Sequence, residues 1–215
     1  MWALLPWLRE HGLALGLARA GERSARPGGP AERGLAAAMP PPRRRDFLAG
    51  RCAARRALAA AALPVAQIPC AGRRPRLPAG CVGSISHSGG LAVALAAPGR
   101  RFGALGCDLE LRGLPSAAAH LVLNAAEQAW MRGAASPARA EHRLLAAFSA
   151  KEAAYKAYCA LLPEGEAPAL LRDIATVPVP GGFTARPKGR PGPPLRVRVD
   201  RVGPGVFSWT AVPAR

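Results

Sequence analysis

The amino-acid sequence predicts an α+β protein made of two similar halves, each with an antiparallel sheet and packed helices. Two observations lead to this prediction. Helical patterns precede closely spaced extended segments in the first half of the 215-residue chain, and the same order returns in the second half. Half of the residues are apolar, which is enough for a substantial core. No residue-level repeat is visible, so the expected duplication is one of architecture only.

Breaker residues and helix formers define the elements of the first half. Loops are expected at RPGGP (26–30) and MPPP (39–42), because glycine and proline interrupt regular structure there. The alanine- and arginine-rich stretch 43–63 predicts a long helix that ends before Pro64. A basic loop at 68–80 leads to three extended segments, which predict an antiparallel meander. These segments are residues 81–86, 91–97 and 102–110.

The second half repeats this order of elements. Helical patterns cover residues 115–132 and 141–162. Three extended segments follow them, at 183–186, 195–202 and 206–212. We therefore expect two similar halves, 1–100 and 101–215.

The charge of the chain indicates an anionic partner. Thirty basic residues stand against thirteen acidic ones, which gives a net charge of +17 and a pI near 11.5. Arginine greatly outnumbers lysine, which indicates a compositional bias of the whole chain. Basic charge alone is therefore weak support for an anionic partner. Each lysine, in turn, is an unusual residue in this sequence. A small basic nucleic-acid-binding protein is the alternative from another class. Few aromatic residues and no zinc-type or RNP-like spacing speak against it.

The cysteines and the apolar runs point to the cytoplasm. Five cysteines without C-x-x-C spacing suggest reduced thiols. Charged residues at 9–11 interrupt the apolar N-terminal run, which argues against a signal peptide. No stretch reaches the ~18 continuous apolar residues that a membrane helix needs. We expect a soluble protein without a membrane partner, for which a monomer is sufficient.

The stretch GSISHSGG (83–90) raises the question of a serine–histidine pair. Neither Ser86 nor Ser88 has the flanking glycines of a nucleophile elbow, and Ser86 and His87 would point to opposite faces of a strand. An anion-binding turn explains this stretch better than a serine nucleophile does, because the glycines allow close approach of the backbone and the imidazole can donate a hydrogen bond to a phosphate. A structural histidine at a tight turn is the remaining alternative.

Acidic residues form the next motif. Asp108 and Glu110 in GCDLE are two apart on an expected strand, so both carboxylates project from one face. Paired hard oxygen donors suit Mg²⁺, although an exposed strand end with two solvated acids would look the same. In FSAKEAAYK, Glu152 and Lys156 share a helix face and could form a simple surface ion pair. A third carboxylate and two rare lysines, Lys151 and Lys156, also fit a metal-assisted phosphate site.

Taken together, these motifs resemble the 4′-phosphopantetheinyl transferases. GSISHS, GCDLE and FSAKEAAYK follow one another with the order and spacing of that family, in the branch of the enterobactin-synthase (surfactin-type) enzymes. The stretches RRRDFLAGRCAARRAL and PRLPAGCVGSISHS are similar to the branch's upstream motifs. The resemblance spans residues 43–162. It implies an enzyme that moves the 4′-phosphopantetheine arm of coenzyme A onto a serine of an apo acyl, peptidyl or aryl carrier protein, releasing adenosine 3′,5′-bisphosphate.

The same resemblance implies roles for single residues. The two halves would be related by a pseudo-twofold axis. Coenzyme A and Mg²⁺, with Mn²⁺ as an alternative ion, would bind between a nucleotide-gripping first half and a catalytic second half. Asp108, Glu110 and Glu152 match the metal ligands, with Glu152 as the base and Lys151 at the leaving phosphate. The coenzyme contacts would come from Arg43, Arg51, Arg73, Arg74, Ser86, His87, Lys151 and Lys156. Arg73 and Arg74 stand where relatives often have a lysine, and Arg43 and Arg51, eight residues apart, are expected to reach the 3′-phosphate from one helix face.

Overall fold

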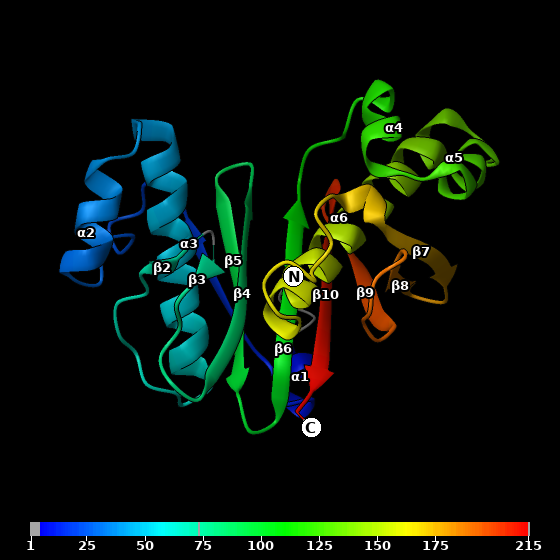
Figure 1. The fold of residues 1–215 in the computed structure, drawn as a ribbon. Helices are drawn as coiled ribbons and strands as arrows, with labels where there is room; N and C mark the ends of the chain where they lie inside the picture. Colours follow the sequence, from blue (N-terminus) through cyan, green and yellow to red (C-terminus); the bar gives the residue numbers. More distant parts are fainter. Residues whose placement is uncertain (1–4, 73, 215) are drawn as a thin grey trace. The chain divides into compact units, whose positions relative to one another are not determined.

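The computed structural model describes residues 5–72 and 74–214, which divide into two compact units (Figure 1). The first unit runs through Leu105 and takes in the C-terminal residues from Pro213, whereas the second comprises Gly106–Val212. Each unit combines helices with antiparallel strands, which confirms the predicted α+β class.

The first unit is built around one long helix, α3 (Pro41–Ala60), which packs on a three-stranded antiparallel sheet. Prolines in the first turn of α3 are tolerated because the backbone N–H groups have no partner there. The strands, in spatial order, are β1 (Ala14–Arg19), β5 (Leu91–Pro98) and β4 (Cys81–Ser88). The remaining elements are α1 (Leu5–Glu10), α2 (Pro30–Ala37), β2 (Cys70–Ala71) and β3 (Arg74–Pro75).

The predicted three-strand meander is wrong in its third member. β4 and β5 form the expected hairpin, but β6 (Phe102–Glu110) belongs to the second sheet, beside β10 (Gly205–Pro213). The free edge of β5 is taken by β1, with Ala14 opposite Ala96 and Arg19 opposite Leu91. β5 is buried from Ala92 to Ala97, so it needs a partner on both edges, and a short, glycine-containing strand far away in the chain supplies the second one.

The second unit places another long helix, α6 (Pro137–Leu161), on a five-stranded sheet with the order β6-β10-β9-β8-β7. The strands not yet given are β7 (Ile174–Val179), β8 (Gly182–Pro187) and β9 (Leu195–Val202). β7 was absent from the sequence prediction. No helix in the described part of the chain is both long and apolar enough to cross a membrane.

The helix expected over 115–132 is broken into shorter pieces. They are the 3₁₀ turn η2 (Ser116–Ala118) and the helices α4 (Ala119–Val122) and α5 (Ala125–Arg132). Another 3₁₀ turn, η3 (Leu171–Asp173), precedes β7 later in the chain. Asn124 is the reason for the break between α4 and α5. Its side chain accepts from the Glu127 N–H, while the Glu127 carboxylate accepts from the Asn124 N–H, and this capping box starts a new helix.

In each unit a strand glycine lies directly against the backbone of the long helix. A Cβ atom at Gly16 would collide with the carbonyl oxygen of Ala53 in α3, and one at Gly106 would collide with that of Ala153 in α6. Only glycine allows strand and helix to approach this closely. The positions of the two long helices on their sheets therefore depend on these two residues.

Gly106→Ala is expected to lower the free energy of unfolding by about 1–3 kcal/mol, because the new methyl group meets helix backbone that cannot yield locally. Gly103→Ala on the same strand is the matched control, since its Cβ would find ordinary contact at 3.5 Å from the Pro213 carbonyl oxygen. Urea denaturation of both variants measures the difference. Equal stability of the two would contradict the close approach at Gly106.

Candidate functional site

The carboxylate of Asp108, on β6, lies beside two charged side chains of α6. Asp108 is only 3% exposed. Nζ of Lys156 donates hydrogen bonds to Oδ1 of Asp108 at 2.8 Å and to the Cys107 carbonyl at 3.1 Å. The same ammonium lies 3.9 Å from Oε2 of Glu152, one helical turn earlier. Because Gly106 lets α6 approach β6, the ammonium of Lys156 reaches the carboxylate of the strand and links it to Glu152.

Partial burial changes the proton affinities of the two helix residues. Burial raises the pKa of Glu152; Asp108 adds to this effect and Lys156 opposes it. Burial also disfavours the ammonium of Lys156, but its neighbours, Asp108 foremost, outweigh this and raise the pKa of Lys156 above its ordinary value. The group thus combines a firmly charged cation with a carboxylate of increased proton affinity, which suits charge neutralisation and proton transfer.

The donor types at this site fit a magnesium ion. Asp108 and Glu152 offer hard oxygen ligands, and the repulsion between them would be relieved by a divalent cation. Glu110, the third expected ligand, ends β6 and is partly exposed. Within residues 5–72 and 74–214, however, no three carboxylate, histidine or cysteine side chains converge as a metal site. The complete ligand set therefore stays a prediction.

The structure does not bring Lys151 into this group. The Lys151 side chain is fully buried, and its Nζ donates to Oε2 of Glu127 at 2.6 Å and to the Val122 carbonyl at 2.8 Å. Burial lowers the pKa of Lys151, while its hydrogen bond with Glu127 acts in the opposite direction. A contact between Lys151 and the leaving phosphate stays a prediction, and it would require this enclosed ion pair to open.

Glu127 is the residue of this unit that the sequence reasoning missed. Its carboxylate is buried and accepts four hydrogen bonds, from Asn124, Lys151 and both the backbone N–H and the hydroxyl of Thr176. These contacts join α5, α6 and β7. The signal in the sequence is the N-x-x-E spacing of a capping box at 124–127, inside the stretch for which the helical pattern predicts one continuous helix.

In the first unit the structure brings Arg43 to His87. Nη1 of Arg43, in the first turn of α3, lies 3.3 Å from Nε2 of His87 near the end of β4. Nδ1 of His87 lies 4.0 Å from Oδ2 of Asp46. The preceding Ser86 is 7% exposed. Beyond β4 the chain turns through Gly89 and Gly90 at positive φ, as expected for the tight turn of GSISHSGG.

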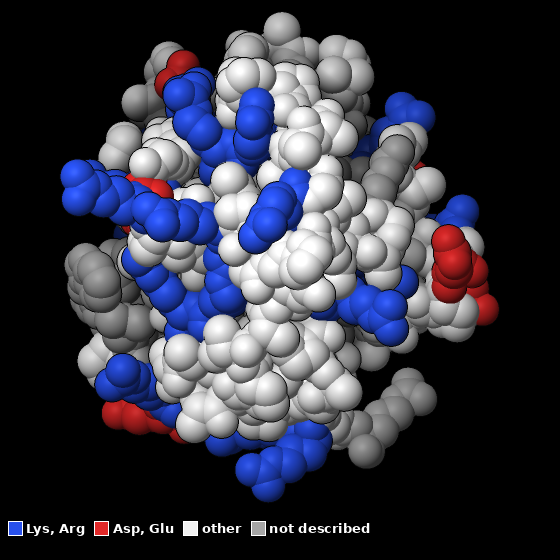
Figure 2. All heavy atoms as spheres, turned by 90° about the vertical axis from the view of Figure 1, so that its left-hand side faces the viewer, with Lys and Arg blue, Asp and Glu red and all other residues white. Residues whose placement is uncertain are grey.

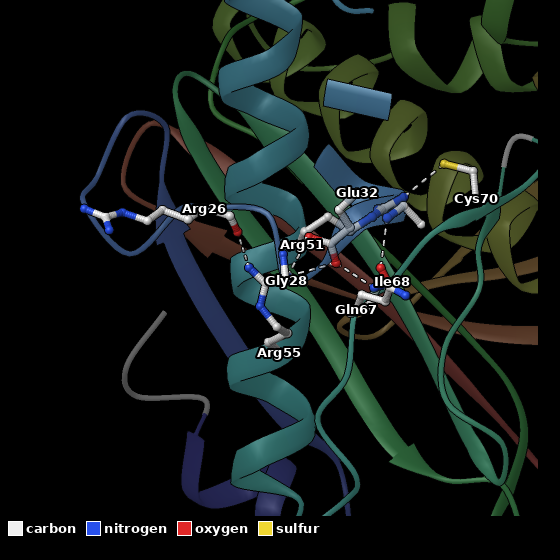
Figure 3. Close-up of polar contacts among 9 residues, drawn as sticks. Arg26, Gly28, Glu32, Arg51, Arg55, Gln67, Ile68 and Cys70 are labelled. Carbon is white, nitrogen blue, oxygen red and sulfur yellow. Dashed lines mark hydrogen bonds and ion pairs between the residues drawn. The ribbon is translucent and has the colours of Figure 1, made fainter. Parts of the chain in front are cut away.

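Arg51 does not join Arg43 at this position. It is 7% exposed, and its Nη2 donates to Sγ of Cys70 at 3.2 Å (Figure 3). Its guanidinium also lies 4.5 Å from the ring centre of Phe47. Arg74 is exposed on β3, and Arg73 lies outside the described residues. The contacts expected of Arg51, Arg73 and Arg74 with the coenzyme stay predictions.

The surface of the first unit is strongly basic. Figure 2 shows the face on the left of Figure 1, where basic side chains are spread widely and acidic ones are few. Arg43, Arg44 and Arg45 are all exposed at the start of α3. Two acids of this unit are already paired, Glu22 with Arg56 and Glu32 with Arg55. This surface is suited to an anionic ligand or partner.

Family models match both units. A model described as the 4′-phosphopantetheinyl transferase N-terminal domain matches residues 31–97, and one described as the 4′-phosphopantetheinyl transferase superfamily matches residues 104–185. The chain belongs to the 4′-phosphopantetheinyl transferase superfamily. This confirms the family resemblance found in the sequence, whereas membership of the enterobactin-synthase-like branch stays a prediction.

Two curated relatives carry the same family name. The chain is 39% identical over 131 residues to the 4′-phosphopantetheinyl transferase Npt of Nocardia iowensis, an alignment that covers 60% of this chain and 58% of the relative. It is 36% identical over 166 residues to the 4′-phosphopantetheinyl transferase Svp of Streptomyces mobaraensis, covering 73% and 64%. The chain thus spans less than two thirds of the length of either relative. These matches give no support to a nucleic-acid-binding function.

Proposed function

We propose that this protein transfers the 4′-phosphopantetheine arm from coenzyme A to a serine of an apo acyl, peptidyl or aryl carrier protein. The serine oxygen forms a bond to the β-phosphorus, the bond from that phosphorus to the bridging oxygen breaks, and adenosine 3′,5′-bisphosphate leaves. The observation that carries the proposal is the convergence of Asp108, Glu152 and Lys156 in a chain that belongs to this superfamily.

Glu152 is the proposed acceptor of the serine proton. Its carboxylate is partly exposed and lies 3.9 Å from the ammonium of Lys156, and a carboxylate placed beside a hydroxyl accepts its proton. Lys156 offsets negative charge near the reacting phosphate, and Asp108 holds the ammonium in place at 2.8 Å. Asp108, Glu110 and Glu152 would together hold Mg²⁺, which would neutralise charge on the pyrophosphate.

Arg43 and His87 are the proposed contacts for coenzyme phosphates. They lie 3.3 Å apart at the start of α3 and the end of β4, and both are accessible. A guanidinium provides a planar set of donors that suits phosphate oxygens, and the adjacent imidazole adds one more. Lys151 and Arg51 are buried against protein partners, so a contact of either side chain with the coenzyme would require a local rearrangement.

Arg43→Ala is expected to weaken coenzyme A binding by about 1.5–3 kcal/mol, the range for a hydrogen bond to a charged group. The resemblance assigns Arg43 to the 3′-phosphate, so binding of dephospho-coenzyme A should hardly change. Arg44→Ala is the matched control, since Arg44 is an exposed neighbour in the same helical turn. Calorimetry at fixed salt measures the affinity of the parent protein and of both variants for coenzyme A and for dephospho-coenzyme A. Equal losses with both ligands would place Arg43 on a different phosphate.

The transfer reaction is tested by the intact mass of the acceptor. The protein is incubated with coenzyme A, Mg²⁺ and a panel of apo carrier proteins, and a carrier that gains the mass of the arm is a substrate. Chelation of the metal should stop the reaction, and a carrier whose serine is replaced by alanine should stay unmodified. Absence of transfer to every acyl, peptidyl and aryl carrier in the panel would refute the proposal.

A further inference from the structure

The first unit has a pocket where α3 ends. Its volume is about 590 Å³. Apolar walls come from residues 60–62 at the end of α3, from Leu13 and Ala14 where β1 begins, and from Pro98 at the end of β5. Sites for small organic ligands have this size, with mainly apolar walls and a few polar groups that fix the ligand.

Three exposed arginines line the same pocket. They are Arg9 of α1 and Arg100 and Arg101 of the turn between β5 and β6. Among the residues that the structure describes, no acidic one belongs to the lining. The C-terminal end of α3 brings roughly half a negative charge to the pocket, against three positive charges. The pocket is therefore positively charged, which attracts an anion.

The three guanidinium groups are not engaged by acidic side chains. In the described part of the chain, no ion pair and no side-chain hydrogen bond involves Arg9, Arg100 or Arg101. Elsewhere in this unit the arginine Arg55 pairs with Glu32 at 2.8 Å. A compositional bias explains the number of arginines in the chain, but it does not explain why three without an acidic partner surround one pocket.

Arg101 lies against the backbone of Gly12, which also lines the pocket. A Cβ atom at Gly12 would lie 2.2 Å from Nη1 of Arg101, so a side chain at position 12 would displace the guanidinium. Gly12 has a φ of 73°, in the region that favours glycine. The guanidinium also lies 5.7 Å from the ring centre of Phe102. These contacts place Arg101 at the pocket and use none of its hydrogen-bond donors.

We propose that this pocket binds a small organic anion with two or more carboxylate or phosphate groups. Arg9, Arg100 and Arg101 would hold the charged groups, because a guanidinium donates paired hydrogen bonds to carboxylate and phosphate oxygens alike. The apolar walls would cover the carbon skeleton. The pocket is separate from the proposed coenzyme contacts, since Arg43 and Ala60 lie about 25 Å apart along α3 at 1.5 Å per residue.

Nuclear magnetic resonance titration of the whole protein tests this site. Citrate and fructose 1,6-bisphosphate are added separately, without metal and at an ionic strength held constant with sodium chloride. The backbone amide signals of Gly12 and Leu13 should shift and saturate with at least one of the two anions. Saturation by citrate alone would identify a carboxylate ligand, and saturation by the bisphosphate alone a phosphate ligand. Absence of saturable shifts with both anions would overturn the proposal.

Three variants separate a defined site from general attraction to a basic surface. Arg100→Gln and Arg101→Gln should each weaken the binding by about tenfold or more, measured at the same amide signals. Arg33→Gln removes the same charge from an exposed position on α2 and should change the affinity by less than about twofold. An equal loss in all three variants would overturn the proposal. The titration uses neither coenzyme A nor a carrier protein, so its outcome is independent of the transfer reaction.

Discussion

Replacing Glu152 with glutamine is expected to lower the turnover of carrier-protein modification by about 10²–10⁴-fold, the usual contribution of a general base. Glutamine keeps the size of the side chain but loses both the negative charge and the ability to accept the serine proton. The side chain is partly exposed and glutamine has the same shape, so the variant should fold normally. Steady-state kinetics with coenzyme A and a modified carrier as product measure the loss.

Glu141→Gln is the matched control for this experiment, because Glu141 is an exposed carboxylate on the same helix, α6. It should retain full turnover. A Glu152→Gln variant that changes only the KM for coenzyme A would show that Glu152 contributes to binding and not to proton removal. Circular dichroism of both variants separates a chemical effect from a loss of structure.

The local elements of the fold could be predicted from the sequence, but their partners could not. The expected helix over 43–63 corresponds to α3, and residues 195–202 form β9 as predicted. Strand periodicity identifies a strand without identifying its neighbour, which is why β6 was assigned to the wrong sheet. β1, with the sequence ALGLAR, has none of the β-branched or aromatic residues that predict a strand, and it exists because β5 requires a second partner.

The residue types of the candidate site were also visible in the sequence, whereas side-chain directions were harder to infer. Glu152 and Lys156, four residues apart, share a face and lie 3.9 Å apart as the spacing suggests, and Lys156 pairs with Asp108. Lys151 and Lys156 are five residues apart, which separates them by roughly 140° around the helix. This rotation explains why Lys151 enters the core beside Glu127 while Lys156 remains at the edge of the site.

A similar rotation separates the two arginines of α3. Eight residues are just over two helical turns, and the rotation beyond two full turns is roughly 80°. Arg43 and Arg51 therefore do not lie on the same face of α3 as closely as the number of turns suggests. Arg43 is exposed beside His87, and Arg51 is buried against Phe47 and Cys70. No spacing rule would have identified Cys70 as the partner, because that contact depends on how the loop at 66–76 folds over α3.

Removal of Glu127 is expected to have the largest effect on stability. Glu127→Ala should lower the free energy of unfolding by about 3–5 kcal/mol, because among the described residues it leaves the fully buried ammonium of Lys151 with the Val122 carbonyl alone as a hydrogen-bond partner. It also removes the acceptor for the backbone and the hydroxyl of Thr176. Urea denaturation measures the change, and Glu166→Ala, at an exposed position, should stay within about 0.5 kcal/mol of the parent protein.

A second substitution tests whether the unpaired ammonium of Lys151 causes the loss of stability in Glu127→Ala. Adding Lys151→Met to Glu127→Ala removes the buried ammonium while keeping an unbranched side chain of similar length, so the double variant should be more stable than Glu127→Ala alone. If the loss came only from the hydrogen bonds to Thr176, the second substitution would bring no recovery. A recovery of stability in the double variant would establish that Lys151 and Glu127 act as one buried ion pair. This pair joins α5, α6 and β7, and α6 also carries the proposed catalytic residues.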